Sequence, residues 1–330
     1  MGVNFLGAGF MAPGHMGKGV DILSISGDHD LTRTIGDSRL DIPESRLRRL
    51  DFISKLLIGA TKLCLDDADF SAWNVDLSRF GAVVGTAHGS IDVLLDFDAS
   101  IYDGNISAIK FPNTVVSQST GHICMEFGFQ GPSATFCSGG VSGFQAAMYA
   151  ATLIQEGHAD VMLVGGADVL IQTVEQLEGV IPSEMLPLSE GGVALILASD
   201  EFVVENNCTS YARLTSSGQT FSTGGNKESS IVGWWDSVLG RVGTEGSYDY
   251  VATSFTSRKR LAAMLKRSPA TFHCLDERLG NMRAGSALLS LVDAALSVRR
   301  ASVMGFPLRG TSAYCDVTGY NAFVTFDDPS

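Results

Sequence analysis

The segment Gly131-Pro-Ser-Ala-Thr-Phe-Cys-Ser-Gly-Gly-Val-Ser-Gly143 decides how this chain is expected to fold. A short extended run leads into a glycine turn, and a stretch rich in Ala and Met, with almost no charge, follows over Ser142–Gln155. A helix that is apolar on all sides must be buried on most of its surface. The next apolar run, Val161-Met-Leu-Val-Gly-Gly, predicts a buried strand. The segment therefore predicts a strand, a sharp turn, a buried helix and a second strand of an α/β protein.

Similar elements extend outward from this unit in both directions. Apolar runs bounded by glycine, at Phe80–Gly85, Val161–Gly166 and Val193–Ala198, are expected to be strands of one parallel sheet. The other expected elements are a helix over Glu44–Asp66, strands at Tyr250–Phe255 and Ala322–Phe326, a buried helix at Ala284–Arg299 and a loop at Thr215–Asn226. No linker separates residues 1–200 from 201–330. We therefore expect two similar halves packed into a single unit.

The composition excludes several classes of function. Hydrophobic residues make up 45% of the 330 residues and charged residues 18%, which allows a sizeable core. The net charge of -13 argues against binding to nucleic acid or to an anionic membrane surface. The first residues show no signal peptide, and no apolar run approaches the roughly 20 residues of a membrane span. Six scattered cysteines without a CxxC pair fit reduced thiols, so a cytoplasmic protein without a metal site is expected.

Several local patterns could indicate other chemistry. Gly7-Ala-Gly-Phe-Met-Ala12 matches a dinucleotide fingerprint, but Pro13-Gly14 should break the helix that would receive the pyrophosphate. Ser142 lies in Gly139-Gly-Val-Ser-Gly143, although Phe144 occupies the last glycine position of a nucleophile elbow. Cys137 is expected to be a buried strand cysteine. The pair Asp276-Glu277 is expected on the surface, and the histidines share no spacing that would suggest a joint site.

The ordered match from Gly131 to Asp168 resembles the β-ketoacyl synthase family. In that family, a strand after Gly-Pro-Ser leads to a nucleophilic Cys at a helix N-terminus, followed by a buried helix and an Ala-Asp…Gly-Gly strand. Weaker similarities occur at Val3–Gly14, Ser189–Leu197, Tyr248–Ser254 and Gly319–Phe323. The resemblance implies a thiolase-like α/β fold of five layers, αβαβα, with two pseudo-symmetric halves. It also implies no cofactor.

The same resemblance implies that the catalytic side chains are missing. A condensing enzyme needs a thiolate to hold the acyl chain and two imidazoles to assist decarboxylation. The nucleophile position falls on Gly140, and the first His position falls on Ser254. The Lys position falls on Asp276, and the second His position falls on Asn281. Condensation by this chain would therefore require a partner.

One branch of the family is built in this way: the chain-length factors of type II polyketide synthases, which pair with a catalytic ketosynthase and shape its tunnel. The run Ser119-Thr-Gly-His-Ile resembles their Thr-Gly-Gln-Ile helix. Members for aromatic products commonly carry Gln at the nucleophile position, from which Gly140 departs, leaving a structural and tunnel-forming role. The resemblance implies that this helix lines the tunnel or the dimer interface. Helical spacing places Val116, Thr120 and Ile123 on one of its faces, with Ser119 beside them and His122 nearby.

The resemblance also predicts the partners. A catalytic ketosynthase would complete a heterodimer. Because acyl carrier proteins are acidic, and this chain has a net charge of -13, the carrier is expected to dock mainly on the catalytic partner. The alternative hypothesis is a stand-alone acyltransferase or thioester hydrolase of the same fold that uses Cys137 or Ser142 as its nucleophile.

Overall fold

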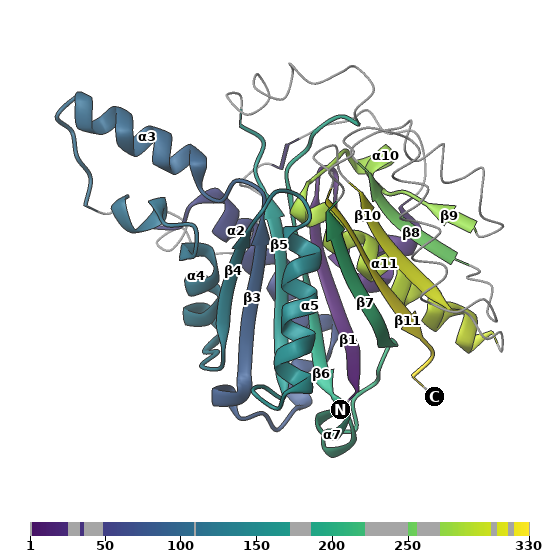
Figure 1. Ribbon diagram of the computed structural model, residues 1–330. Coiled ribbons are helices and arrows are strands. Elements are labelled where there is room, and N and C mark those ends of the chain that lie inside the picture. The colour runs from purple at the N-terminus through teal and green to yellow at the C-terminus, as the bar shows by residue number, and fades with distance from the viewer. Residues whose placement is uncertain are drawn as a thin grey trace.

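The structure, a computed structural model, describes residues 2–25, 34–35, 49–108, 110–171, 186–221, 250–255, 271–304, 309–315 and 320–329. One continuous mixed sheet of eleven strands forms its body (Figure 1), and its two halves, joined only through β1 and β7, are called here the first and the second sheet. The strands of the first sheet, in spatial order, are β4 (Ser133–Cys137), β3 (Phe80–Thr86), β5 (Val161–Asp168), β6 (Gly191–Ser199) and β1 (Val3–Ala12), with β2 (His15–Lys18) paired to β1. Those of the second are β7 (Ala212–Phe221), β11 (Tyr320–Asp327), β10 (Gly310–Cys315), β8 (Tyr250–Phe255) and β9 (Thr271–His273).

The two sheets have the same topology. Numbered along the chain within each half and leaving out β2, the strands of both sheets follow the order 3-2-4-5-1. In both sheets the first three strands of that order are parallel and the last two pairings are antiparallel. The sheets meet where the start of β1, Val3–Phe5, pairs with Ala212–Leu214 of β7. This repeat is the thiolase-like architecture predicted from the sequence.

Two strand predictions were wrong in part. The run Val193–Ala198 lies in the first sheet as expected, but β6 is antiparallel to β5. An apolar run indicates burial on both faces and carries no information on strand direction. The expected loop at Thr215–Asn226 is strand β7 as far as Phe221, and its other residues lie outside the described part. Its small polar residues are mostly exposed, and backbone pairing with β11 holds them in the sheet.

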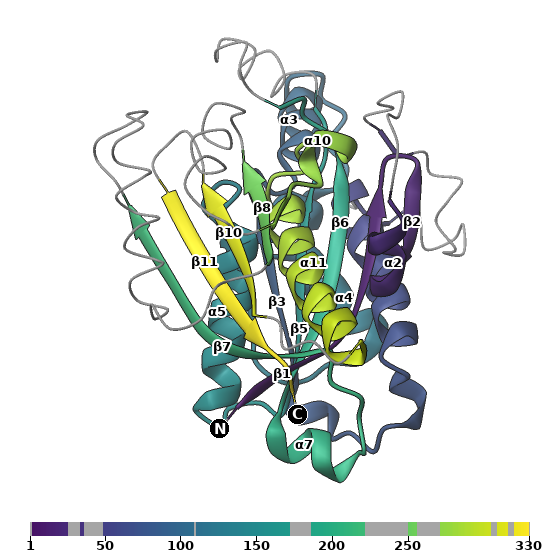
Figure 2. The same cartoon turned by 90° about the vertical axis from the view of Figure 1, so that its right-hand side faces the viewer.

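Four helices position the candidate site. Helices α5 (Ser142–Gln155) and α11 (Ala284–Val303) pack together between the two sheets (Figure 2), which confirms both buried helices predicted from the sequence. Helix α2 (Phe52–Asp67) packs on β1, β5 and β6, and α4 (Gln118–Phe127) packs on α2. The helix expected over Glu44–Asp66 begins only at Phe52, because Asp51 caps α2 and residues 49–51 are not helical. Residues 44–48 of that expected helix lie outside the described part, as do residues 222–249 between β7 and β8.

Glycines let the central helices approach the first sheet closely. A Cβ atom added to Gly85 on β3 would lie 2.3 Å from the Ser142 carbonyl oxygen, and one added to Gly166 on β5 would lie 2.7 Å from that of Ala284. These distances are shorter than any carbon–oxygen contact that packing allows. The N-termini of α5 and α11 therefore meet the carboxyl ends of β3 and β5, where the candidate site lies.

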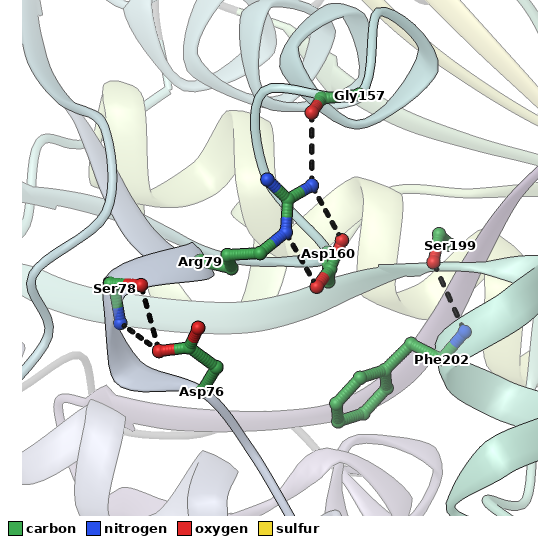
Figure 3. Close-up of polar contacts among 7 residues, drawn as sticks. All are labelled: Asp76, Ser78, Arg79, Gly157, Asp160, Ser199 and Phe202. Atoms are coloured by element: carbon green, nitrogen blue, oxygen red, sulfur yellow. Dashed lines mark hydrogen bonds and ion pairs between the residues drawn. The ribbon is translucent and has the colours of Figure 1, made fainter.

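Polar contacts fix the opposite end of the same strands (Figure 3). Arg79, just before β3, donates two hydrogen bonds of 2.7 Å to Asp160, just before β5, and one of 2.9 Å to the Gly157 carbonyl. Asp76 accepts from Ser78 at the short helix η4 (Leu77–Arg79), and Ser199 caps helix α7 (Asp200–Glu205). These contacts align the strand starts.

One part of the chain projects from this body (Figure 1): helix α3 (Ile91–Tyr102) and the short helix η5 (Phe111–Thr114). No residue of α3 is buried, and four of its large apolar side chains are exposed. We call residues 91–116 the arm. Its large exposed apolar side chains are Leu94, Leu95, Ile101, Tyr102, Ile106, Phe111, Val115 and Val116. None of the described helices is long and apolar enough to cross a membrane.

Candidate functional site

The turn between β4 and α5 is held rigidly by Ser142. Its hydroxyl donates a hydrogen bond of 2.7 Å to the Gly139 carbonyl and accepts one of 2.7 Å from the Ser138 backbone N–H. Gly139 has a φ of 80°, in the left-handed region that favours glycine. Ser142 is fully buried, so its hydroxyl is part of the turn and is not presented to a substrate.

Gly140 lies at the centre of this turn, facing Tyr314 of β10. A Cβ atom added to Gly140 would lie 2.1 Å from the Tyr314 hydroxyl oxygen and 3.0 Å from Cζ of the ring. Tyr314 is only 1% exposed, and the centre of its ring lies 6.1 Å from that of Phe144 on α5. The space in which a side chain at residue 140 would begin is therefore already filled.

Ser254 and Asp276 form a buried pair beside this position. The Ser254 hydroxyl donates a hydrogen bond of 2.8 Å to Asp276 Oδ2, and both residues are buried. Ser254 on β8 is the register partner of Tyr314 on β10, so the two side chains lie on the same face of the sheet. The expected surface position was wrong for Asp276, whereas Glu277 is exposed as expected. The sequence pattern could not show that Ser254 binds its carboxylate.

Asn281 shapes the connection between α10 (Asp276–Leu279) and α11. Its side-chain oxygen accepts a hydrogen bond of 2.7 Å from the Arg283 backbone N–H. Its backbone N–H donates to the Pro187 carbonyl at 2.7 Å, and its carbonyl accepts from the Ser189 N–H at 3.0 Å. Asn281 is buried, and the geometry gives it a role in fixing the start of α11.

Sequence reasoning missed a buried carboxylate, Asp168, at the end of β5. It accepts hydrogen bonds from the Thr86 hydroxyl at 3.0 Å, the Ala87 N–H at 2.8 Å and the Ala284 N–H at 3.1 Å. Burial is the main cause that raises its pKa, and the positive charge of Arg283 opposes that effect. Asp168 thus ties the ends of β3 and β5 to the N-terminus of α11. Its place at the end of a buried strand was the only signal in the sequence.

Cys137 ends β4 and is exposed, so the expectation of a buried cysteine was wrong. β4 is the edge strand of the first sheet, and its two ends face outward. The Cys137 thiol is 3.5 Å from the Ala87 carbonyl. Partial burial, and then the nearby Asp168 carboxylate, raise the pKa of this thiol above its ordinary value. A thiol with a raised pKa is a poor nucleophile, because the thiolate is the reactive form.

Four of the five residues of the expected tunnel face lie on α4, but Val116 does not. α4 begins at Gln118, so Val116 precedes the helix and does not share its face, and its side chain is 37% exposed. Ser119, Thr120 and Ile123 are buried within this chain, and the Thr120 and Thr135 hydroxyls are 2.6 Å apart. The predicted spacing from Val116 to Thr120 crosses the start of α4, which no signal in the sequence marks.

His122 is half-buried between α4 and α2. Its Nδ1 atom is 2.9 Å from the Ser54 hydroxyl, and its Nε2 atom is 2.8 Å from the Gln118 amide nitrogen. Burial is the main cause that lowers the pKa of His122, while the Asp51 carboxylate acts in the opposite direction. The imidazole is therefore neutral near pH 7, and it connects the two helices.

The glycine pattern near the N-terminus does not form a dinucleotide site. Residues Val3–Ala12 are all in strand β1, which turns into β2 rather than into a helix. A Cβ atom at Gly9 would lie 2.3 Å from the Ala60 carbonyl oxygen, so this glycine serves the packing of α2 on β1. Among the described residues, no group of three or more His, Cys, Asp or Glu side chains could hold a metal ion.

Comparisons with known proteins agree with this architecture. The family model of the β-ketoacyl synthase N-terminal domain matches residues 32–185. Nodulation protein E of Rhizobium sp. (strain N33) is 28% identical over 182 residues, covering 51% of this chain and 45% of that protein. Putative polyketide β-ketoacyl synthase 1 of Streptomyces halstedii is 27% identical over 206 residues, covering 52% and 48%. The matches span about half the length of these curated relatives.

Solved structures match over nearly the whole chain. The ishigamide ketosynthase/chain length factor has a TM-score of 0.81 at 18% identity, covering 99% of both chains. A type II polyketide synthase acyl carrier protein in complex with its ketosynthase gives a TM-score of 0.78 at 19% identity, also covering 99% of both. The chain therefore has the thiolase-like ketosynthase fold. The sequence likeness to the β-ketoacyl synthase family is confined to the N-terminal half, where the family model matches residues 32–185.

Proposed function

We propose that this chain is a non-catalytic, ketosynthase-like subunit that pairs with an active ketosynthase and shapes the tunnel for its growing acyl chain. The observation that carries the proposal is Gly140, at the turn where the family holds its nucleophile. A glycine offers no atom to bind an acyl group, and the Tyr314 hydroxyl lies where such an atom would begin. The subunit would act as a chain-length factor does in the heterodimers that it resembles.

The other three positions aligned with catalytic residues of the family support the same proposal. Condensing enzymes stabilise developing negative charge with preorganised donors. Here Ser254 and Asp276 place a hydroxyl and a carboxylate in contact, and Asn281 uses its side-chain oxygen in a backbone contact. These three residues are the ones aligned with the family's His, Lys and His. None of them offers an imidazole, so we assign the chain no decarboxylation or condensation step of its own.

The surface supports a partner. The arm exposes a row of large apolar side chains, and β4 leaves one edge of the first sheet without a strand partner among the described residues. Exposed apolar patches and open strand edges are typical of surfaces that another chain covers. A catalytic ketosynthase is the partner that fits, by likeness to a ketosynthase/chain length factor structure. An acyl carrier protein would reach the complex through that partner.

The alternative, a stand-alone acyltransferase or thioester hydrolase, finds little support in the geometry. Ser142 is buried and binds the turn backbone with its hydroxyl. Cys137 is exposed, but its raised pKa leaves little thiolate at neutral pH.

A two-part experiment tests the proposal. The purified chain, supplied with acyl and malonyl carrier proteins, is expected to form no condensation product. The chain co-expressed with the intact ketosynthase of its own organism is expected to give a 1:1 heterodimer by native mass spectrometry, and product in the same assay. The proposal would be overturned if the chain alone catalysed condensation. It would also be overturned if the ketosynthase were active without binding the chain.

A further inference from the structure

We infer that Tyr314 closes, from within the chain, the space that a nucleophile at residue 140 would need. Gly140 and Tyr314 would then be a coupled pair: a larger side chain at residue 140 would fit only if the side chain at residue 314 were smaller. This inference rests on the proposed function in one respect, that residue 140 marks the nucleophile position. The contact between the two residues stands independently of any partner.

The direction of the Tyr314 side chain follows from its strand. Tyr314 and Ser254 are register partners on the neighbouring parallel strands β10 and β8, and side chains at paired positions point to the same face. That face meets the turn before α5, which carries Gly140. The Tyr314 hydroxyl oxygen, Cζ and Cε2 lie 2.1, 3.0 and 3.3 Å from the position of a Cβ atom on Gly140. Hydroxyl and ring together fill the site.

Neither side of this contact can yield easily. Tyr314 is among the largest fully buried side chains of the protein, and Phe144, which is also fully buried, lies beside its ring. A rotation would push the ring into a packed interior. The backbone just before Gly140 is held by two hydrogen bonds of Ser142, the first residue of α5, to the Ser138 N–H and the Gly139 carbonyl. Any side chain at residue 140 must therefore displace one of these fixed groups.

A contrast within the chain gives a matched control. Gly121, inside α4, has no atom within 4 Å of an added Cβ, so Gly121→Ala should be tolerated or slightly stabilising. Gly140→Ala adds the same methyl group against Tyr314 and should destabilise. Tyr314→Phe removes only the hydroxyl, the nearest atom of the contact, and so tests that atom alone.

The first experiment is a double-mutant cycle on the full chain, read as the midpoint of thermal unfolding. Gly140→Ala is expected to lower the midpoint by roughly 3 °C or more, while Gly121→Ala does not. In the Tyr314→Phe background, the loss caused by Gly140→Ala should be clearly smaller, because coupled residues are not additive. Equal losses in both backgrounds, or no loss at all, would overturn the inference. This experiment uses the chain alone, so its result does not depend on whether the proposed heterodimer forms.

The second experiment asks whether shortening Tyr314 opens the space. The variants Gly140→Cys and Gly140→Cys with Tyr314→Ala are treated with iodoacetamide, where a thiolate displaces iodide and forms a thioether. Peptide mass spectrometry follows labelling at residue 140, with the native Cys137 as reference. Labelling should be about tenfold faster in the double variant, because thiol reactivity follows exposure. Equal rates relative to Cys137 would show that Tyr314 does not close the site, even if the cycle shows coupling.

Discussion

At the scale of single residues, Tyr314 leaves room at position 140 for no more than a hydrogen atom. The pair Ser254 and Asp276 sits beside it as a satisfied buried hydrogen bond, which costs far less free energy than an unpaired buried carboxylate would. Gly140 thus belongs to a set of residues that fit one another. Replacing one of them alone should not create the geometry or the catalytic groups of an active site, and we expect Gly140→Cys to remain inactive in condensation.

His122 allows a prediction about pH. Burial lowers its folded-state pKa below the ordinary value of 6.5, so the unfolded chain takes up a proton at a higher pH than the folded chain does. Stability should therefore fall as the pH drops below about 6.5, until the folded-state pKa is reached.

The variant His122→Gln keeps a polar partner for Ser54 and removes the titration. Urea unfolding at pH 7.5 and pH 5.5 should show a smaller loss of unfolding free energy for His122→Gln than for the wild type. All other titrating groups are common to both proteins, so the difference isolates this imidazole. Equal losses would show that His122 does not contribute to acid sensitivity.

At the scale of elements, α4 and the end of the arm divide the expected tunnel face into two parts. Ser119, Thr120 and Ile123 point into the packed interior of this chain, where Ile123 joins the core beneath α2. Val116 lies before the helix, exposed, and next to Gly89. Of the predicted set, Val116 is the residue that a partner or an acyl chain could reach without unpacking the subunit.

The two parts should respond differently to a larger side chain. Val116→Phe in the heterodimer is expected to shorten the product by one or more condensation units if this residue lines the tunnel. Thr120→Phe is expected to lower the free energy of unfolding by about 1–3 kcal/mol, because it overfills a packed site against Thr135. Product length is measured by mass spectrometry, and stability by urea unfolding. Unchanged length in Val116→Phe heterodimers that assemble normally would remove this residue from the tunnel wall.

At the scale of the whole molecule, two sheets of identical topology enclose α5 and α11, while the arm stands outside this body (Figure 1). A helix with no buried residue gains little from tertiary packing, which supplies most helical stability in proteins. In the proposed heterodimer, the ketosynthase partner would cover the exposed apolar side chains of the arm.

Charge placed on the arm should weaken assembly. Leu94→Lys combined with Leu95→Lys is expected to reduce the fraction of heterodimer in native mass spectra, because the lysines would have to be desolvated at the interface. Val204→Lys is the control, since Val204 is 79% exposed on α7, away from the arm in Figure 1. The arm would be excluded as the interface if the double variant assembles as well as this control.

The sequence alone determined several of the helices and strands, because hydrophobic periodicity and glycine placement are local signals. The uncharged stretch Ser142–Gln155 could only be a buried helix, and the helix has those same bounds. The helix at 284–299 and the strand at 250–255 were equally clear. The order of Gly-Pro-Ser, turn, helix and Gly-Gly strand was enough to suggest the family fold, which the structural comparisons show.

Only the tertiary structure decided what depends on contacts between distant residues. Tyr314 lies 174 positions from Gly140, and nothing in either local sequence announces that they touch. The burial of Asp276, the exposure of Cys137 and the direction of β6 have the same origin. Burial of a polar side chain depends on which partner the fold brings to it, and strand direction depends on the path of the connection. The pattern of residues along the sequence predicts whether an element is a helix or a strand, whereas the tertiary fold determines which elements it contacts.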